Sequence, residues 1–297
     1  MQNMWFNWLT ALTKGVLLMA IQIVTDSTVQ LTAEELATLP ITVVPLIVRI
    51  GNQEYFNDGQ DITNTEILTH LINDTELPKT SQPSIGQFLE VFDRLGQNGD
   101  SVLCLSLTHF LSGTVNAARQ AADMSATDVT VIDSLSIDRG LAFQVITAAK
   151  LAKNGAPLEA IIAAVDLHRS HTKIYVFLNT LENLIKGGRL SKAAGGIASL
   201  LNIKVMGEVV DGELQVAAKG RGKKFLNKQI DAVIDDIKAV SPAKVGLTHV
   251  DNLTTVSEIS QRIKAALPET LVTIHEAGPV ISTYTGIGAL AIEYYTD

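Results

Sequence analysis

The sequence has little cysteine, few aromatic residues and no long apolar run. Cys104 is its only cysteine, and aromatic residues make up 5% of its 297 residues. A single cysteine excludes a disulfide framework, so we expect a cytoplasmic protein with Cys104 buried in the apolar run around it. No apolar stretch reaches the roughly 18 residues that a membrane-spanning helix needs. The sequence therefore predicts no stable membrane insertion.

Positive charge is also scarce. The chain has 23 Lys and Arg residues against 31 Asp and Glu residues, which gives a net charge of -8. Without a long basic run, a general nucleic-acid binder is excluded. The 6 histidines are scattered. His168 and His171 share a predicted helix face but lack a third ligand, so we expect no metal site and no cofactor.

The first 20 residues do not follow the pattern of the rest of the chain. They contain Trp5 and Trp8 but lack a basic start and a signal-cleavage pattern. We interpret residues 1–20 as an N-terminal extension. It is either an over-long reading frame or a loosely attached segment, with the natural start at Met19. An amphipathic anchor is the alternative.

The pattern after residue 20 predicts two α/β domains with the ligand between them. Strand-like and helix-like segments alternate over residues 21–171, which is typical of a parallel sheet with helices on both faces. Residues 172–297 also contain a hairpin around Asp211-Gly212, so a mixed sheet is expected there. In this scheme residues 43–50 form one strand, Thr283 lies in a loop, and a terminal helix begins near Ile287.

Three segments place small hydroxyl residues between a strand-like and a helix-like run. They are residues 80–84 (TSQPS), residues 111–114 (LSGT) and residues 282–286 (STYTG). Backbone N–H groups at a helix start, the helix dipole and hydroxyl groups together bind carboxylates and phosphates. Each segment alone is weak evidence, since Ser and Thr at such places are more often plain helix N-caps. Their recurrence predicts that the three segments converge on one anionic head group.

Other residues leave alternatives open. Residues 186–189 (KGGR) are either a helix C-cap with solvated charges or, with Arg189 and the cluster around Arg221, a positive surface beside the head group. An enzyme is a second possibility, with Asp26 as a nucleophile or with Ser112 activated by His109. For neither nucleophile does the sequence show a complete set of partners.

Five segments, taken in order, resemble the DegV family of bacterial fatty-acid-binding proteins. They are residues 23–28 (IVTDST), 80–84, 111–114, 186–189 and 278–288. The resemblance extends over residues 21–297 and leaves out the first 20. At one position the sequence departs from the family, because Tyr284 stands where a histidine is usual between two threonines. A tyrosine offers a neutral hydroxyl group but no cation near neutral pH.

The resemblance implies a carrier without catalytic residues of its own. One long-chain fatty acid would lie in an apolar tunnel between the domains and be presented to a separate, dihydroxyacetone-kinase-like fatty acid kinase, which makes acyl phosphate for phospholipid synthesis. Arg189 and Arg221 would serve phosphorylation or kinase docking. The alternatives are an enzyme acting on a small phosphorylated or carboxylated metabolite, and a lipid-binding regulatory protein without kinase coupling. The residues expected at the ligand are Thr28, Thr80, Ser81, Ser112, Gly113, Thr283, Tyr284 and Thr285.

Overall fold

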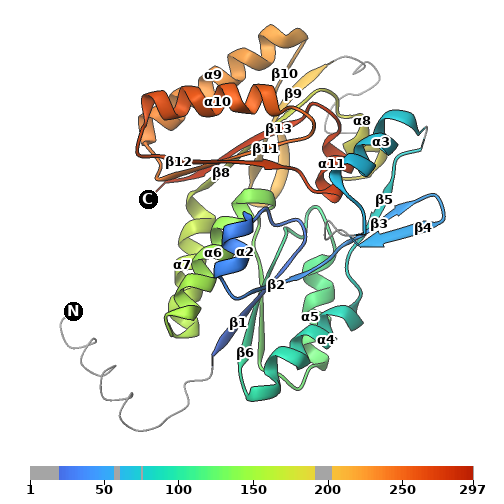
Figure 1. Ribbon diagram of the computed structural model, residues 1–297, viewed down its shortest axis with the longest axis vertical. Coiled ribbons are helices and arrows are strands. Elements are labelled where there is room, and N and C mark those ends of the chain that lie inside the picture. Colours follow the sequence, from blue (N-terminus) through green and yellow to red (C-terminus); the bar gives the residue numbers. More distant parts are fainter. Residues whose placement is uncertain (1–19, 57–60, 75, 191–202, 297) are drawn as a thin grey trace.

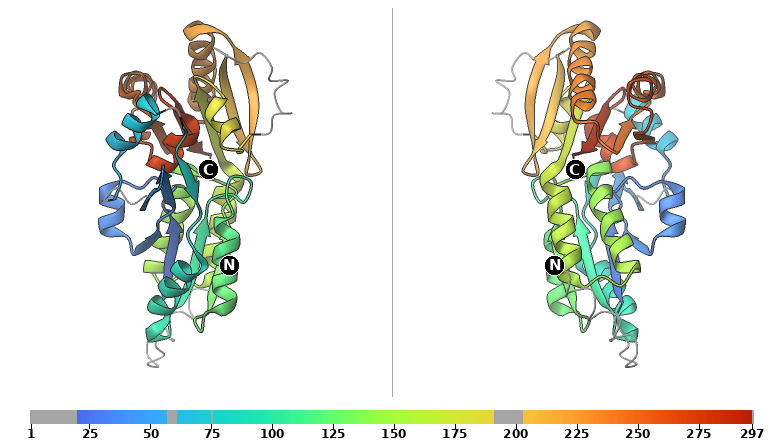
Figure 2. Two further views of the ribbon diagram at one scale, coloured as in Figure 1. Left: turned by 90° about the vertical axis from the view of Figure 1, so that its right-hand side faces the viewer. Right: turned by 90° about the vertical axis from the view of Figure 1, so that its left-hand side faces the viewer.

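The computed structural model describes residues 20–56, 61–74, 76–190 and 203–296 (Figure 1). The predicted extension, apart from Ala20, lies outside the described residues. The described chain forms a parallel sheet, a mixed sheet and a small third sheet. Figure 2 shows the parallel and mixed sheets one above the other along the long axis of the molecule.

A four-stranded parallel sheet occupies the first part of the chain, with strand order β2-β1-β6-β7. Successive residues of a strand face opposite sides of a sheet. Thus Ile23 and Leu103 pack against α6 and α7, while Val24 and Cys104 pack against α4 and α5. The strands and helices are β1 (Ile21–Asp26), α2 (Ala33–Thr38), β2 (Ile41–Val44), α4 (Ile85–Leu95), β6 (Ser101–Ser106), α5 (Thr114–Met124), β7 (Val129–Asp133), α6 (Asp138–Lys153) and α7 (Leu158–His171).

A six-stranded mixed sheet follows, with strand order β10-β9-β8-β13-β11-β12. Only β11 and β12 pair in parallel, and every other pair is antiparallel. Two helices, α9 and α10, cover one face through aliphatic residues such as Ile234 and Ile259. The elements are β8 (Thr172–Leu178), β9 (Lys204–Val210), β10 (Glu213–Gly220), α9 (Gly222–Val240), β11 (Lys244–His249), α10 (Leu253–Ala266), β12 (Leu271–Glu276) and β13 (Leu290–Tyr295).

The fold class predicted from the sequence is confirmed. The hairpin forms as expected, with Asp211 and Gly212 both in the left-handed region at φ 49° and 87°, which suits a tight two-residue turn. The chain passes from the parallel to the mixed sheet between α7 and β8. The domain limits at residues 171 and 172 stay a prediction.

The prediction of one strand over residues 43–50 is wrong. The segment forms the end of β2 and then β3 (Ile47–Ile50), which belongs to a separate sheet of order β4-β3-β5. Pro45 has no N–H to donate to a sheet, and the N–H of Leu46 donates to Ser27 Oγ at 2.9 Å instead. The sequence analysis did not identify the partner strand β4 (Gln53–Phe56). The third strand of this sheet is β5 (Lys79–Ser81), and α3 (Asn64–Asn73) packs beside it.

The expected loop at Thr283 and the terminal helix from Ile287 are also wrong. Thr283 lies in the short helix α11 (Pro279–Thr285), and the chain then forms β13. β13 lies between β8 and β11 in the middle of the mixed sheet, and Leu290 to Tyr294 are buried there. The pairing with two neighbouring strands thus decides the conformation of a segment whose local sequence also suits a helix.

Helix α6 lies between the two large sheets. One side packs on the parallel sheet, and its first turns approach β8, β11 and β13 on the face of the mixed sheet opposite α9 and α10 (Figure 1). Gly246 of β11 allows this approach, because a Cβ atom there would lie 2.3 Å from Arg139 Cγ. Arg139, which is 1% exposed, donates through Nη1 and Nη2 to both carboxylate oxygens of Glu35, each at 2.6 Å.

Removal of the negative charge of this ion pair should destabilise the fold. Glu35→Gln leaves the buried Arg139 guanidinium without a charged partner. We expect the free energy of unfolding to fall by about 2 kcal/mol in urea denaturation, somewhat less than for a fully buried pair. The matched control is Glu54→Gln, since the Arg49–Glu54 pair is more than half exposed. That variant should lose less than about 1 kcal/mol. Equal losses would contradict the role of the buried pair.

The same pair predicts a pH dependence. Burial acts to raise the pKa of Glu35, but hydrogen bonds from Arg139 and Thr32 hold this pKa below its usual value. Such a carboxylate stabilises the fold above its unfolded-state pKa of about 4.3, and the stabilisation is lost as the pH falls through the folded-state pKa. The difference in unfolding free energy between wild type and Glu35→Gln should therefore shrink below a pH of about 4. A constant difference in urea denaturation down to that range would contradict this.

Candidate functional site

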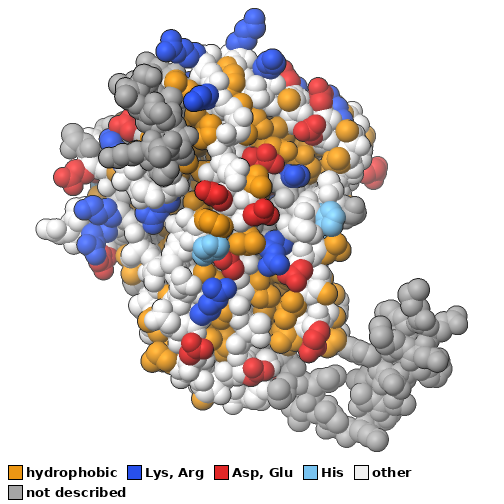
Figure 3. Space-filling view, turned by 180° about the vertical axis from the view of Figure 1, so that it is seen from behind, with side chains coloured by type: hydrophobic (Ala, Val, Ile, Leu, Met, Phe, Trp, Pro, Cys, Tyr) orange, Lys and Arg blue, Asp and Glu red, His pale blue; other side chains and the backbone are white. Residues whose placement is uncertain are grey.

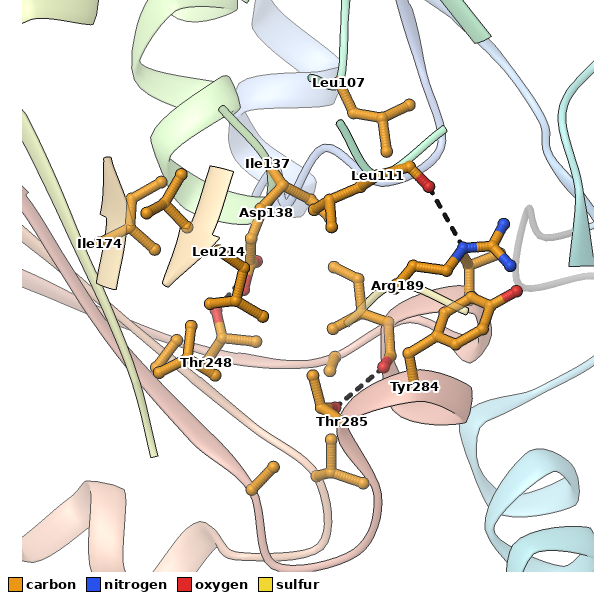
Figure 4. Close-up of a pocket in the computed structure, with 18 of the residues that line it drawn as sticks. Leu107, Leu111, Ile137, Asp138, Ile174, Arg189, Leu214, Thr248, Tyr284 and Thr285 are labelled. Atoms are coloured by element: carbon orange, nitrogen blue, oxygen red, sulfur yellow. Dashed lines mark hydrogen bonds between the residues drawn. The ribbon is translucent and has the colours of Figure 1, made fainter. Parts of the chain in front are cut away.

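A pocket lies between the parallel sheet, the mixed sheet and α11. Aliphatic side chains from all three make most of its wall, among them Leu107, Ile137, Ile174, Val176, Val250 and Ile281. Figure 4 shows the side chains of Leu107, Leu111, Ile137 and Leu214 around the pocket. Such a lining suits an apolar ligand, with the polar side chains at the margin fixing its orientation.

Hydroxyl groups and one guanidinium group gather at one end of the pocket. Thr80, Ser112, Arg189 and Tyr284 line it there, while Thr285, which also lines the pocket, donates its hydroxyl to the carbonyl of Ile281 at 2.9 Å. The hydroxyl groups of Thr80 and Tyr284 hydrogen-bond at 2.5 Å across 204 residues of sequence. The Arg189 guanidinium lies over the Tyr284 ring, 4.4 Å from its centroid. All three segments that the sequence analysis singled out therefore supply side chains to one pocket.

The turn after α8 (Glu182–Lys186) directs Arg189 to this place. Gly187 ends the helix, and Gly188 takes φ 75°, so the KGGR segment does form a helix C-cap. The same turn brings Arg189 inward, where Nε donates to the carbonyl of Leu111 at 3.2 Å. Gly187 cannot carry a side chain, because a Cβ atom would lie 2.3 Å from the Tyr284 ring. The segment is thus a helix C-cap whose turn also brings Arg189 to the pocket, and its role beside a head group stays a prediction.

The Ser112 loop precedes helix α5. Ser112 Oγ lies 2.9 Å from Thr114 Oγ1, and the Thr114 N–H points to Ser112 Oγ at 3.3 Å. Gly113 is the N-cap residue of the helix, without a side-chain cap. The first N–H groups of this 11-residue helix therefore lie beside the hydroxyl-lined end of the pocket.

Five of the predicted site residues do not line the pocket. Thr28 is buried beside Asp26, and Thr283 is buried with its hydroxyl donating to the carbonyl of Pro279 at 2.8 Å. Ser81 is exposed next to Thr80, and Gly113 lies beside Ser112. Arg221 is exposed at the start of α9.

Asp26 joins the ends of two parallel strands. Its Oδ1 accepts from the N–H and hydroxyl groups of Thr28 at 3.0 and 2.6 Å, and its Oδ2 accepts from the N–H of Leu107 at 2.7 Å. Burial raises the pKa of this fully buried carboxyl group, and the three hydrogen bonds oppose that rise. These contacts hold the segment that leads from β6 into the Ser112 loop.

The other catalytic candidates have different partners. His109 Nδ1 lies 2.6 Å from Asp133 Oδ2, whereas the contact of Ser112 is Thr114. Cys104 is buried, and burial raises the pKa of its thiol to about 12, so it is not a thiolate near neutral pH. Over the described ranges, no three or more His, Cys, Asp or Glu side chains are grouped to hold a metal ion.

In the part of the chain that the structure describes, no helix is both long and apolar enough to span a membrane. On the face seen in Figure 3, positive and negative side chains are interspersed among apolar and uncharged ones.

Four polar residues of the pocket wall, among them His249, were not predicted. Asp138, Thr248 and Glu293 line the pocket, and all three are buried. In Figure 4, Asp138 and Thr248 lie together, away from Arg189 and Tyr284. They come from α6, β11 and β13, which the sequence does not mark as neighbours. The order of strands places Thr248 beside Glu293, and the packing of α6 on β11 and β13 brings Asp138 to them.

The parallel and mixed sheets, with an aliphatic pocket between them that carries hydroxyl groups at one end, define an α/β protein with a site suited to an apolar ligand. The chain belongs to the DegV family, since the family model described as uncharacterised DegV proteins matches residues 20–297. A DegV domain-containing protein of Streptococcus pneumoniae serotype 4 is 41% identical over 272 residues, which cover 92% of this chain and 97% of that protein.

Solved structures of the family are similar to this fold. A DegV protein from Thermus thermophilus, described by its fatty acid binding, has a TM-score of 0.85 and 30% identity over 94% of this chain and 100% of that one. The fatty acid kinase (Fak) B3 protein of Streptococcus pneumoniae, loaded with linoleic acid, has a TM-score of 0.81 and 26% identity with the same coverage. Fatty acids are thus ligands of proteins with this fold.

Asp26 gives a prediction that separates a structural from a catalytic role. In Asp26→Asn, an amide N–H₂ replaces one acceptor and faces a backbone N–H. We expect the free energy of unfolding to fall by about 2 kcal/mol in urea denaturation. The control is Asp123→Asn, an exposed carboxylate on α5, which should change it by less than about 0.5 kcal/mol. Wild-type stability in Asp26→Asn would support the enzymatic alternative instead.

Proposed function

We propose that this protein binds one long-chain fatty acid in the pocket, with its carboxylate at the end formed by Thr80, Ser112, Arg189 and Tyr284. The observation that carries the proposal is the pocket itself, an aliphatic cavity with hydroxyl groups and a guanidinium at one end. A fatty acid has the same division between an apolar chain and one anionic group. Ser81, Gly113 and Thr283 then support this end, as neighbours of the contacting residues or through their backbone, Thr285 lines the same pocket, and Thr28 acts at a distance through Asp26, which holds the segment leading to Ser112.

The energetics suit such a ligand. Each methylene group removed from water contributes about 0.8 kcal/mol, so a chain of 16 carbons provides on the order of 10 kcal/mol before association costs. A buried carboxylate without partners would cancel much of this gain. The hydroxyl groups of Thr80 and Ser112, the N–H groups at the start of α5 and the Arg189 guanidinium supply those partners.

We also propose that the protein acts together with a fatty acid kinase. The bound acid is presented to a separate, dihydroxyacetone-kinase-like fatty acid kinase that forms acyl phosphate for phospholipid synthesis. The structural likeness to the Fak B3 protein supports this role. Arg189 beside the head group suits a developing phosphate, and the exposed Arg221 suits an acidic partner surface. The chain is then a cytoplasmic carrier of two domains, which needs no cofactor and is not itself an enzyme.

Tyr284 can serve this function through hydrogen bonding and ring contact, without carrying a positive charge. Its hydroxyl bonds to Thr80, and its ring holds Arg189 by a cation–π contact. Tyr284 therefore supplies a hydroxyl group and an orienting ring, while the positive charge at this end comes from Arg189. A lipid-binding regulatory protein, which keeps the ligand without passing it to a kinase, is the alternative that shares this geometry.

Mass spectrometry of an organic extract from the purified, denatured protein tests the ligand class. A stoichiometric long-chain fatty acid is the expected result. After delipidation, Ser112→Ala should weaken palmitate binding about tenfold, because a hydrogen bond to a charged group contributes about 1.5 kcal/mol. Thr69→Val, an exposed hydroxyl on α3, is the control and should bind like wild type. If the extract contains no fatty acid and the protein takes up none from a mixture of fatty acids, the result would favour an enzyme that acts on a small metabolite.

The kinase step has its own test. Arg221→Ala should keep wild-type affinity for palmitate but reduce kinase-dependent formation of acyl phosphate. Lys264→Ala, another exposed cation on the same part of the fold, is the matched control. Unchanged acyl phosphate formation by Arg221→Ala would exclude the role of Arg221. No acyl phosphate with any variant, despite bound lipid, would favour the regulatory protein.

A further inference from the structure

Two buried carboxyl groups lie in the pocket wall apart from the proposed head-group end. Asp138 is the first residue of α6 and is 4% exposed, while Glu293 lies in the centre of β13 and is 0% exposed. The hydroxyl of Thr248 on β11 donates to Asp138 Oδ1 at 3.1 Å. Three elements that are far apart in sequence thus place polar groups on one part of an otherwise aliphatic wall.

Glu293 lacks the hydrogen bonds that a buried carboxyl group normally has. Neither of its carboxyl oxygens has a partner of normal geometry in the described parts of the chain. The Asp138 side chain and the backbone N–H groups of Arg139 and Gly140 approach it only as weak hydrogen-bonding partners. The carboxyl oxygens of Glu293 therefore keep the capacity for a further, well-formed hydrogen bond to a ligand in the pocket.

The two carboxyl groups do not both carry charge at neutral pH. Burial raises the pKa of Asp138 to about 7, and burial next to Asp138 raises that of Glu293 well above its usual value. At least one of the two groups is therefore protonated near neutral pH and able to donate a hydrogen bond. The pair can donate to a ligand oxygen and also accept from a ligand hydroxyl group.

The backbone of Asp138 adopts an unfavourable conformation that accompanies the contact of its side chain with Thr248. Its φ is 60°, in the left-handed region that a residue with a side chain rarely adopts. The N–H of Asp138 donates to the carbonyl of Thr28, and its carbonyl accepts from the N–H of Gln30. These two bonds to the loop after β1 hold the residue in this conformation, and its side chain meets Thr248.

We propose that Asp138, Glu293 and Thr248 bind a hydroxyl group on the acyl chain, so that the protein is selective for hydroxylated long-chain fatty acids. This inference rests on the proposed function, because the carboxylate of the same ligand occupies the Ser112 end. A plain hydrocarbon chain would cover Glu293 without offering it a hydrogen bond. A hydroxyl group at the matching carbon both donates to and accepts from the carboxyl pair.

Competition between two acids tests the proposal. Delipidated protein is incubated with an equimolar mixture of hexadecanoic acid and one monohydroxyhexadecanoic acid, and the experiment is repeated over the positional isomers with the hydroxyl at successive carbons from the methyl end. Native mass spectrometry gives the ratio of the two bound acids, which does not depend on the folded fraction. We expect one isomer to be preferred about tenfold, which corresponds to one well-formed hydrogen bond to a buried group.

Variants assign the preference to the carboxyl pair. Glu293→Met, of similar length but apolar, should bring the ratio to one or below, whereas Glu293→Gln should keep a preference. Thr248→Val is a second variant at the same wall and should reduce the preference, because Asp138 loses its orienting hydrogen bond.

Three outcomes would overturn the inference. If hexadecanoic acid binds and no isomer is preferred, only the inference fails and the proposed function stands. If an isomer is preferred equally by wild type, Glu293→Met and Thr248→Val, the hydroxyl group binds elsewhere. If the folded protein binds neither acid, the proposed function fails as well.

Discussion

The close approach of helix α6 to the mixed sheet is the constraint on which the pocket depends. Arg139 of α6 lies against Gly246 of the mixed sheet, where no side chain fits. Its charge is matched by Glu35 on α2, which lies between β1 and β2 in the sequence. This contact fixes the spacing between two sheets whose strands do not pair with each other. Because the aliphatic walls come from both sheets, the width of the pocket follows from a contact made outside it.

The hydroxyl-lined end depends on contacts between segments that are distant in sequence. Thr80 meets Tyr284, Arg189 meets Leu111, and Asn183 donates to the carbonyl of Thr283 at 3.0 Å. Each of these contacts joins a different pair of segments. Loss of one segment would therefore disturb the position of the others as well as its own contribution. This interdependence suits a site that must hold one carboxylate in a single orientation.

Local chemistry decided which features could be predicted from the sequence. Hydroxyl residues before α4 and α5 and the Asp211-Gly212 turn act within a few residues, so these two segments and the hairpin could be identified, whereas residues 282–286 lie at the end of α11 and precede a strand, unlike the prediction. Pro45 could have marked the break between β2 and β3, since it cannot donate to a sheet. β13 could not be identified in this way, because its conformation depends on strands far away in the chain. The same holds for Asp138 and Glu293, whose proximity follows from the packing of α6 on the mixed sheet.

Strand β13 also has a consequence for how the chain folds. β8 ends at Leu178, and its neighbour β13 begins only at Leu290, with the four other strands of the same sheet between them in sequence. During synthesis, β8 and β11 must therefore remain unpaired on their inner edges until this last strand has been made. Such non-local pairing slows folding and leaves strand edges open to aggregation. The pocket, whose wall includes β13, can exist only once the whole mixed sheet is closed, which links ligand binding to the completion of the fold.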